Sequence, residues 1–303
     1  MCKICDNYYE EAGFLDIHNC QNVTTIPNVI GLQELTIFHC KNLNNISHIE
    51  GLAYIEIVDC PNLTTIPNFE GVNHLSIYDC PNLRYIPNIN GLNELHIKKC
   101  QNIDNIPHIN GLNELRINDC QNIDNIPHIN GLNELRINDC QNIINIPNIE
   151  GLETLYIKNC QNINNIPIIE GLQTLYIKNC QNITNIPIVE GMYELCINNC
   201  NNIVEIPIVT DGCTLCIANF KKYHNYPNHD DDTCNYSLDP NNTYRFKLEH
   251  LYSIIKIVKW YKKLKLSKKL WMYADLVIRD SMNPHKENNK YLEHYIENKV
   301  YQD

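Results

Sequence analysis

The first 220 residues of this 303-residue chain have little positive charge, and this scarcity limits the partners that they can bind. They carry 9 Lys and Arg residues against 24 Asp and Glu residues, a balance of −15, whereas residues 221–303 carry 15 against 11, a balance of +4. Because an acidic surface repels phosphate groups, we do not expect the long first part to bind nucleic acid. The basic end of the chain is compatible with an acidic partner.

The sequence also lacks the motifs of common catalytic sites. It contains no GxSxG, no GxxxxGK[ST] phosphate-binding loop, no glycine-rich dinucleotide turn and no HExxH. The carboxylates of its repeats are expected on an open sheet, where nothing removes them from water or shifts their pKa. We therefore expect a protein that is not an enzyme and that carries no cofactor.

No segment has the features of a membrane span or a secretory signal. The most apolar stretch, LYSIIKIVKWY, is interrupted by Lys256 and Lys259. The start, MCKICDNYYE, has neither a basic nor an apolar region of the kind that a signal peptide needs. We expect an intracellular, cytoplasmic protein with reduced thiols.

One repeated unit dominates the sequence. Residues 101–120, QNIDNIPHINGLNELRINDC, recur unchanged at 121–140, and the same template runs with substitutions from about residue 11 to about residue 219. Its 20-residue period holds without insertion from Cys20 to Cys200. Such constancy indicates that each unit makes the same contacts with the next, as in a stacked solenoid.

The apolar positions of one unit predict the interior of the solenoid. In the unit that begins at Gly151 they are Leu152, Leu155, Ile157, Cys160, Ile163, Ile166 and Ile169. Leu155 and Ile157 alternate with polar neighbours, which predicts a short strand. Pro167 predicts an extended segment, and Gly171 marks the turn into the next unit. Eleven such strands would form a parallel sheet about 50 Å long.

Ten of the 16 cysteines fall on one phase of the repeat. They are Cys20, Cys40, Cys60, Cys80, Cys100, Cys120, Cys140, Cys160, Cys180 and Cys200. A metal centre needs converging ligands, whereas a ladder gives parallel ones, so we interpret these residues as structural: small buried side chains whose S–H groups cap backbone carbonyls. We predict no metal site. The alternative is a zinc site formed by Cys2 and Cys5 with His18 and Cys20.

The variable outward positions of the strands are the expected functional surface. In horseshoe repeats this face is concave and unobstructed, and aromatic and Arg side chains are typical of binding hot spots. The predicted binding face consists of Phe38, Tyr54, Tyr78, His96, Arg116, Arg136, Tyr156, Lys158, Tyr176 and Lys178. Glu94, Glu114 and Glu134 flank the two arginines in a mixed-charge patch. The alternative is an ordinary solvated sheet surface with cross-strand charge pairs.

The repeat resembles the leucine-rich-repeat family. LxxLxIxxC, seen in LETLYIKNC (152–160), is similar to the leucine-rich-repeat signature with Cys at its Asn/Cys position. CPNLTTIP (60–67) is similar to cysteine-bearing repeats of plant immune receptors, and the short period with its proline segment resembles bacterial effector repeats. The resemblance covers about two-thirds of the chain. It implies a β-rich solenoid of about ten repeats with an extended convex side.

A second resemblance concerns the end of the chain. WYKKLKLSKKLWMYADLVIRDSMNP (260–284) is similar to a C-terminal module of repeat proteins of giant DNA viruses. This resemblance implies a member of an expanded viral repeat family with no assigned chemistry. If the chain is viral, we expect it to act on host proteins in the cytoplasm of an infected cell. Apolar spacing after residue 244 predicts helices. The expected domains are an N-terminal cap (1–14), the leucine-rich-repeat solenoid (15–220), a linker or cap loop (221–243) and a helical C-terminal region (244–303).

These observations predict a non-enzymatic scaffold that binds a protein through its concave strand face. One alternative is a substrate adaptor or ligase of the ubiquitin system, because some bacterial repeat effectors carry a ligase domain with a catalytic cysteine. Cys234 is the one candidate for that role in residues 221–303. The other alternative is a structural or virion-associated protein.

Overall fold

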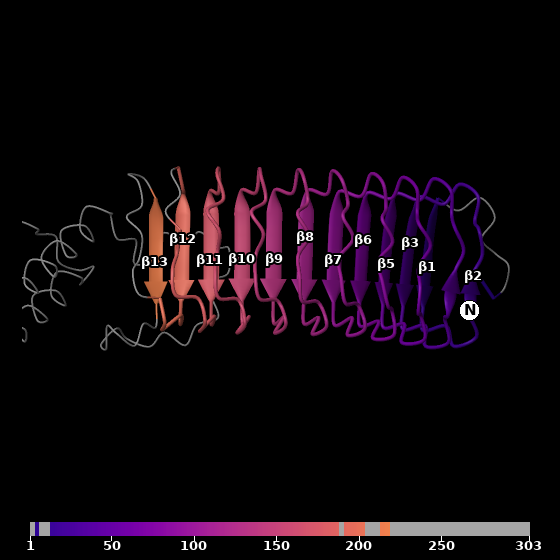
Figure 1. Ribbon diagram of the computed structural model, residues 1–303. Helices are drawn as coiled ribbons and strands as arrows, with labels where there is room; N and C mark the ends of the chain where they lie inside the picture. The colour runs from indigo at the N-terminus through magenta and orange to yellow at the C-terminus, as the bar shows by residue number, and fades with distance from the viewer. Residues whose placement is uncertain (1–3, 6–12, 188–190, 204–212, 219–303) are drawn as a thin grey trace, which may run out of the picture. The chain divides into compact units, whose positions relative to one another are not determined.

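The computed structural model describes residues 4–5, 13–187, 191–203 and 213–218, which form a parallel β-solenoid with a 20-residue spacing. Eleven five-residue strands form one parallel sheet in chain order (Figure 1). They are β1 (Phe14–His18), β3 (Glu34–Phe38), β5 (Tyr54–Val58), β6 (His74–Tyr78), β7 (Glu94–Lys98), β8 (Glu114–Asn118), β9 (Glu134–Asn138), β10 (Thr154–Lys158), β11 (Thr174–Lys178), β12 (Glu194–Asn198) and β13 (Thr214–Ala218). The two-residue strands β2 (Thr25–Ile26) and β4 (Asn45–Ile46) pair separately.

The strands pair in a constant register, so that each residue lies beside its equivalent 20 positions along the chain. Leu115 of β8 pairs with Leu135 of β9, and Ile117 pairs with Ile137. All seven apolar positions predicted for the unit that begins at Gly151 are between 0 and 3 % exposed. The predicted interior is therefore confirmed. Each apolar side chain is shielded by its copies in the turns before and after it.

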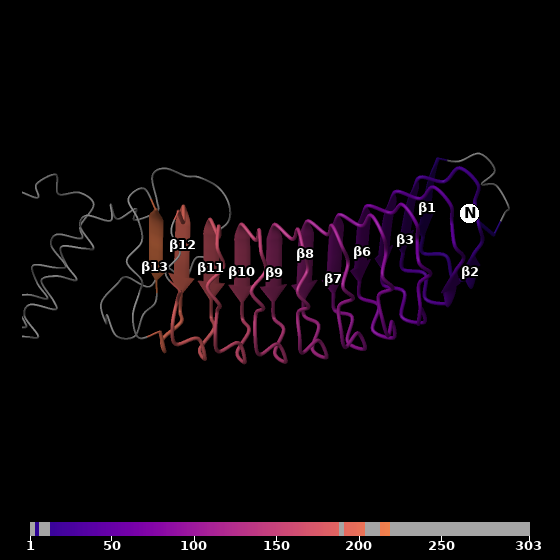
Figure 2. The same ribbon diagram turned by 45° about the horizontal axis from the view of Figure 1, so that its top comes forward.

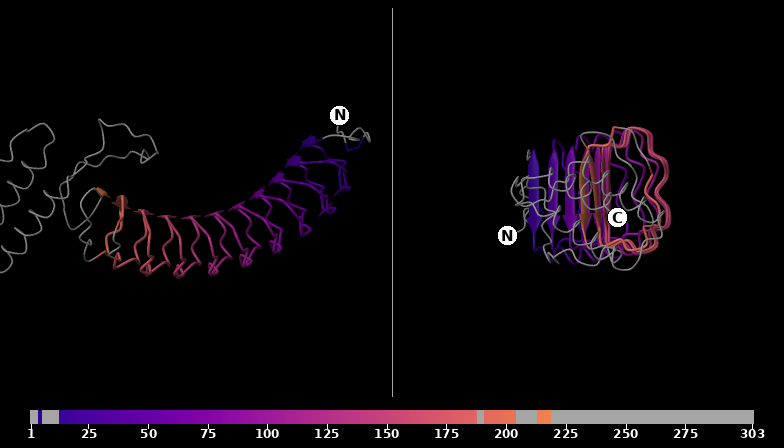
Figure 3. Two further views of the ribbon diagram at one scale, coloured as in Figure 1. Left: turned by 90° about the horizontal axis from the view of Figure 1, so that it is seen from above. Right: turned by 90° about the vertical axis from the view of Figure 1, so that its left-hand side faces the viewer.

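The strands line the concave side of the solenoid (Figure 3). The connecting segments run along the other side, where they form the convex layer that Figure 2 shows beneath the sheet. The turns differ in their outward strand residues but share their inward ones, so the concave surface changes along the array while the interior does not.

Each turn contains two backbone positions in the left-handed region. One is the glycine at the start of the unit, such as Gly111 with φ +82° and Gly171 with φ +83°. The other directly precedes each ladder cysteine, where ten non-glycine residues from Asn19 to Asn199 have φ between 52° and 56°. At this second position the backbone N–H extends the parallel ladder, as when Asp119 N donates to Asn138 O at 2.9 Å. Asn and Asp, which adopt this conformation more readily than other side chains, occupy most of these positions.

Replacing Lys99 with Asn should stabilise the protein. Lys99 has φ +55°, and a left-handed conformation is costly for Lys but much less so for Asn. The Lys99–Asp79 ion pair, with Nζ 3.6 Å from Oδ1, is exposed and contributes little. We expect the free energy of unfolding, measured by urea denaturation, to rise by about 0.5–1 kcal/mol. The control is Lys98→Asn, a position in β7 with ordinary strand dihedrals, which should not increase the free energy of unfolding. An equal increase in both variants would contradict this explanation.

The structure describes part of the predicted N-terminal cap. Of the predicted N-terminal cap, residues 4, 5, 13 and 14 are described, and β1 begins at Phe14. The predicted linker (221–243) and helical region (244–303) lie outside the described residues. The described part of the chain contains no helix with the length and hydrophobicity that crossing a membrane would require.

Candidate binding face

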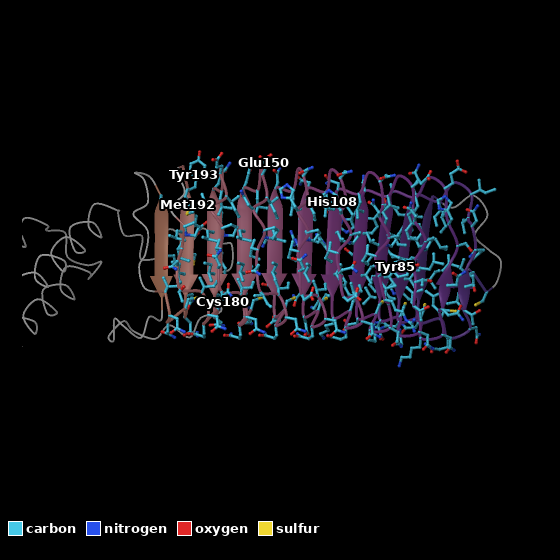
Figure 4. All side chains as sticks on the ribbon, viewed as in Figure 1. Tyr85, His108, Glu150, Cys180, Met192 and Tyr193 are labelled. Carbon is cyan, nitrogen blue, oxygen red and sulfur yellow. The ribbon has the colours of Figure 1, made fainter. Side chains whose placement is uncertain are left out.

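The ladder cysteines are buried along one edge of the sheet. From Cys40 to Cys200 each ladder side chain is 0 % exposed, and Cys20 is 7 % exposed. Figure 4 shows Cys180 near the carboxyl ends of the strands, where its Sγ donates to Lys178 O at 3.3 Å. Burial raises the pKa of Cys100 to about 12 and that of Cys120 to about 11. The thiols of Cys100 and Cys120 therefore stay protonated at neutral pH and are poor metal ligands and nucleophiles.

The residues of the alternative zinc site are only partly brought together. Cys5 Sγ lies 3.4 Å from Cys20 Sγ. His18 points elsewhere: its Nε2 lies 2.6 Å from Asp16 Oδ1, and its ring stacks on Phe38 with centroids 4.7 Å apart. Cys2 lies outside the described residues.

All ten residues of the predicted binding face occupy outward strand positions on the concave side. They differ in exposure: Arg116 is exposed, eight are half-buried, and Tyr176 is only 9 % exposed. Tyr176 is covered because it stacks on its register partner Tyr156, with ring centroids 4.2 Å apart and planes within 2° of parallel. The guanidinium of Arg136 lies 5.7 Å from the Tyr156 centroid, a cation–π contact. The parallel register thus converts repeated tyrosines into a rigid aromatic stack.

A polar network crosses the middle of the face, and it begins at β6. His74 Nδ1 lies 2.8 Å from Glu94 Oε2, and its Nε2 lies 2.8 Å from Ser76 Oγ. The His74 ring is held between Tyr54, on which it stacks with centroids 4.5 Å apart, and the edge of His96 at 5.1 Å. These rings fix the orientation of both imidazoles.

The network continues through alternating charges on β8 and β9. Glu114 Oε1 lies 2.9 Å from His96 Nε2 and also contacts Arg116 Nε. Arg116 Nη2 lies 3.5 Å from Glu134 Oε1, which in turn contacts Arg136 Nε. The mixed-charge patch is therefore a connected chain of ion pairs. Glu114 is 15 % exposed and Glu134 is 24 % exposed, so these pairs are less screened than isolated surface pairs.

Ser76, His74 and Glu94 have the order of a hydroxyl, an imidazole and a carboxylate that is found in nucleophilic hydrolases. The Ser76 side chain is only 2 % exposed, however, and Tyr78 OH donates to its Oγ at 3.3 Å. A substrate carbonyl has no approach to an oxygen that is covered in this way. We interpret the three residues as a positioning network rather than as a catalytic triad.

Burial shifts the pKa of two residues of the binding face, Tyr54 and His96. Burial, followed by the charge of Glu56, raises the pKa of Tyr54 to about 12, and Tyr54 OH donates to Glu56 Oε2 at 3.2 Å. Burial lowers the pKa of His96, although the hydrogen bond to Glu114 opposes that shift. Tyr54 is therefore a neutral hydrogen-bond donor at pH 7, and the His96 imidazole is uncharged.

The outward strand positions could be predicted from the sequence. Two members of the polar network and one cluster of possible metal ligands were not predicted. His74 and Ser76 were not predicted, although both occupy the same outward positions as Glu94 and His96 one turn later. The residues Glu94, His96 and Glu114 each offer a ligand atom, and these atoms all lie within 4.8 Å of one another. The available signal was the period itself, because residues 20 positions apart are direct neighbours.

Comparison with known proteins adds no relative. No family model matches the sequence, and no curated protein matches it either. The parallel β-solenoid is therefore established by the repeat and the structure together.

Proposed function

We propose that this chain is a non-enzymatic, leucine-rich-repeat-type scaffold that binds a protein partner through its concave strand face. The observation that supports this proposal is the Tyr156–Tyr176 stack with Arg136 beside it on the concave side. Tyrosine and arginine are the residue types that most often dominate protein–protein binding energy. Because stacking already fixes these side chains, little conformational entropy remains to be lost on binding.

The distribution of charge along the face favours a partner with two differently charged regions. The outward positions of β1, β3, β5 and β6 include Asp16, Glu34 and Glu56 but no Lys or Arg. Those of β10 and β11 include Lys158 and Lys178 but no Asp or Glu. A folded protein or an extended segment that is basic at one end and acidic at the other complements this arrangement. A nucleic acid, which is uniformly negative, does not.

Removing the aromatic and arginine side chains of the face should abolish capture of the partner. The variant combines Tyr156→Ala, Tyr176→Ala, Arg116→Ala and Arg136→Ala, and the measurement is quantitative affinity capture from the native cell. We expect recovery of the partner to fall at least tenfold, because each hot-spot residue is worth about 1–2 kcal/mol or more.

A matched control is available in exposed tyrosines outside the strands. Tyr85 is 47 % exposed and Tyr193 is 66 % exposed, and the double variant Tyr85→Ala/Tyr193→Ala should leave capture unchanged. Circular dichroism of both variants verifies that they are folded. Full capture by the folded four-residue variant would show that the concave face is not the binding site.

The resemblance of residues 260–284 to a module of giant-virus repeat proteins supports a finer proposal. In it, the chain is a viral protein, the partner is a host protein, and binding takes place in the cytoplasm of the infected cell. Capture from a host-cell extract, compared with capture from purified virions, tests this version. Recovery from virions alone would instead favour the structural or virion-associated alternative.

A further inference from the structure

The centre of the concave face brings one imidazole and two carboxylates together. Glu94 and His96 occupy alternate outward positions of β7, and Glu114 is the register partner of Glu94 on β8. Their ligand atoms lie within 4.8 Å of one another. We propose that Glu94, His96 and Glu114 form a binding site for a divalent transition-metal ion such as Zn²⁺ or Co²⁺. This site lies within the proposed partner-binding face, but its test does not depend on the capture of a protein partner.

The mixture of donors determines the class of metal. Imidazole nitrogen suits zinc, copper, iron, cobalt and nickel, whereas calcium and magnesium sites use oxygen ligands. Zinc sites that keep a further position for water or a bound molecule typically have three protein ligands, and Glu oxygen and His nitrogen are both among the ligands that they use. The cluster is therefore more selective than a group of surface carboxylates.

The carboxylates around the cluster outnumber the guanidinium groups, which favours a bound cation. Glu94, Glu114 and Glu134 lie side by side in register on β7, β8 and β9. Arg116 contacts Glu114 and Glu134, and Arg136 contacts Glu134. Glu94 contacts a histidine, His74, rather than a permanently charged group. Three carboxylates in this row thus face two guanidinium groups.

The surroundings hold the ligands in place. His74 Nδ1 lies 2.8 Å from Glu94 Oε2, so that it can orient the carboxylate from outside the site, as the partners of metal ligands commonly do. Tyr54 stacks on the His74 ring and fixes it in turn. His96 and Glu114 are 13 % and 15 % exposed, and Glu94 is 37 % exposed, so the site is partly enclosed but open to solvent.

The repeat itself shows how specific this arrangement is. The following pair of turns places Glu114, Arg116 and Glu134 at the equivalent positions, with Arg116 in the place of His96. An arginine is a cation and cannot bind a metal ion. Among the described strands, the combination of two in-register glutamates with a histidine two residues after the first of them therefore occurs once along the array.

The test is a titration of the full-length protein, stripped with a chelator, with Zn²⁺ followed by calorimetry and with Co²⁺ followed by visible absorption. We expect one saturable site with nitrogen and oxygen coordination. Loss of a residue that only supports a metal ligand typically weakens metal binding by about 10- to 100-fold. His96→Ala removes a ligand itself, so it should weaken binding by at least this factor. Arg116→Gln should strengthen binding, because it removes a cation that contacts Glu114. Glu194→Gln, an exposed glutamate at the same position of β12, should change nothing.

Three outcomes would overturn the proposal. One is binding of unchanged affinity in a folded His96→Ala variant, verified by circular dichroism. Another is a Co²⁺ charge-transfer band of thiolate coordination, which would assign the metal to cysteines. The last is an absence of saturable binding by the wild-type chain. Because the readout is metal affinity alone, failure here leaves the capture experiment unaffected, and the reverse also holds.

Discussion

Replacing Ile117 with Asp should unfold the middle of the solenoid. Ile117 is 0 % exposed and lies between its register partners Ile97 and Ile137, which are 1 % and 0 % exposed. A carboxylate at this position would be buried without a cationic partner, which costs several kcal/mol. We expect the free energy of unfolding to fall by more than about 4 kcal/mol. Because each turn contacts only its neighbours, the defect should also divide cooperative unfolding into two transitions.

The residue that follows provides the control for this substitution. Asn118 is half-buried on the concave face, and Asn118→Asp introduces the same charge one position along β8. Its free energy of unfolding should stay within about 0.5 kcal/mol of the wild-type value. Chemical denaturation followed by circular dichroism measures both variants. Similar losses from Ile117→Asp and Asn118→Asp would contradict the inward and outward alternation on which the fold depends.

Raising the pH above 9 should destabilise the protein strongly while its thiols remain reduced. Burial raises the pKa of Cys100 from its ordinary value near 9 to about 12, and that of Cys120 and Cys160 to about 11. Between pH 9 and 11 the unfolded chain loses these protons and the folded chain keeps them. The stabilisation is therefore complete below pH 9 and is lost as the pH rises. Each thiol contributes up to about 1.4 kcal/mol per pH unit, so the three together contribute up to about 4 kcal/mol per pH unit.

The measurement is the urea midpoint as a function of pH in the presence of a reducing agent. A variant in which Cys100, Cys120 and Cys160 are all replaced by Ala serves as the comparison, because alanine does not titrate. The variant should be less stable at pH 7, since each substitution removes a buried side chain, but its stability should fall less steeply above pH 9. Equal slopes for the two proteins would mean that the ladder thiols are not buried as protonated groups.

The interior of the solenoid could be predicted from the sequence because burial repeats with the same period as the chain. The positions of Leu155 and Ile157 hold Leu or Ile in every five-residue strand. The pattern can therefore be recognised even where the outward residue of one strand is apolar. The ends of the units were predictable for the same reason, since Gly171 and its equivalents have no other common role. Repetition thus supplied the information that a single strand of five residues lacks.

Two features of the solenoid were hidden for different physical reasons. The left-handed residue before each ladder cysteine varies in type, from Asn19 to His39 to Lys99, so that composition did not reveal it. The network around His74 and Ser76 depends on side-chain rotamers and lateral contacts, which a pattern of apolar positions does not specify. Tyr176 was expected to be exposed, whereas its neighbour Tyr156 covers it.

The glutamines that follow the ladder cysteines illustrate a signal that was present but not used. Gln121 Nε2 donates to Asp139 O at 2.7 Å, and Gln141 Nε2 donates to Asn159 O at 2.6 Å. The same side chains accept from the next turn, as when Gln141 N donates to Gln121 Oε1 at 3.4 Å. Each glutamine therefore joins its turn to the following one. Its recurrence at the 20-residue spacing already indicated a structural ladder.

The most direct test of the stacked arrangement is a set of distances measured by pulsed electron spin resonance. Spin labels carried by an unnatural amino acid at the exposed positions Gln33, Asn133 and Glu153 leave the native cysteines untouched. If every 20 residues advance the chain by one strand, the backbone separation is about 24 Å between 33 and 133 and about 29 Å between 33 and 153. We expect the distances between labels to grow by this constant step with each further turn. Distances that do not increase with the number of intervening turns would contradict it.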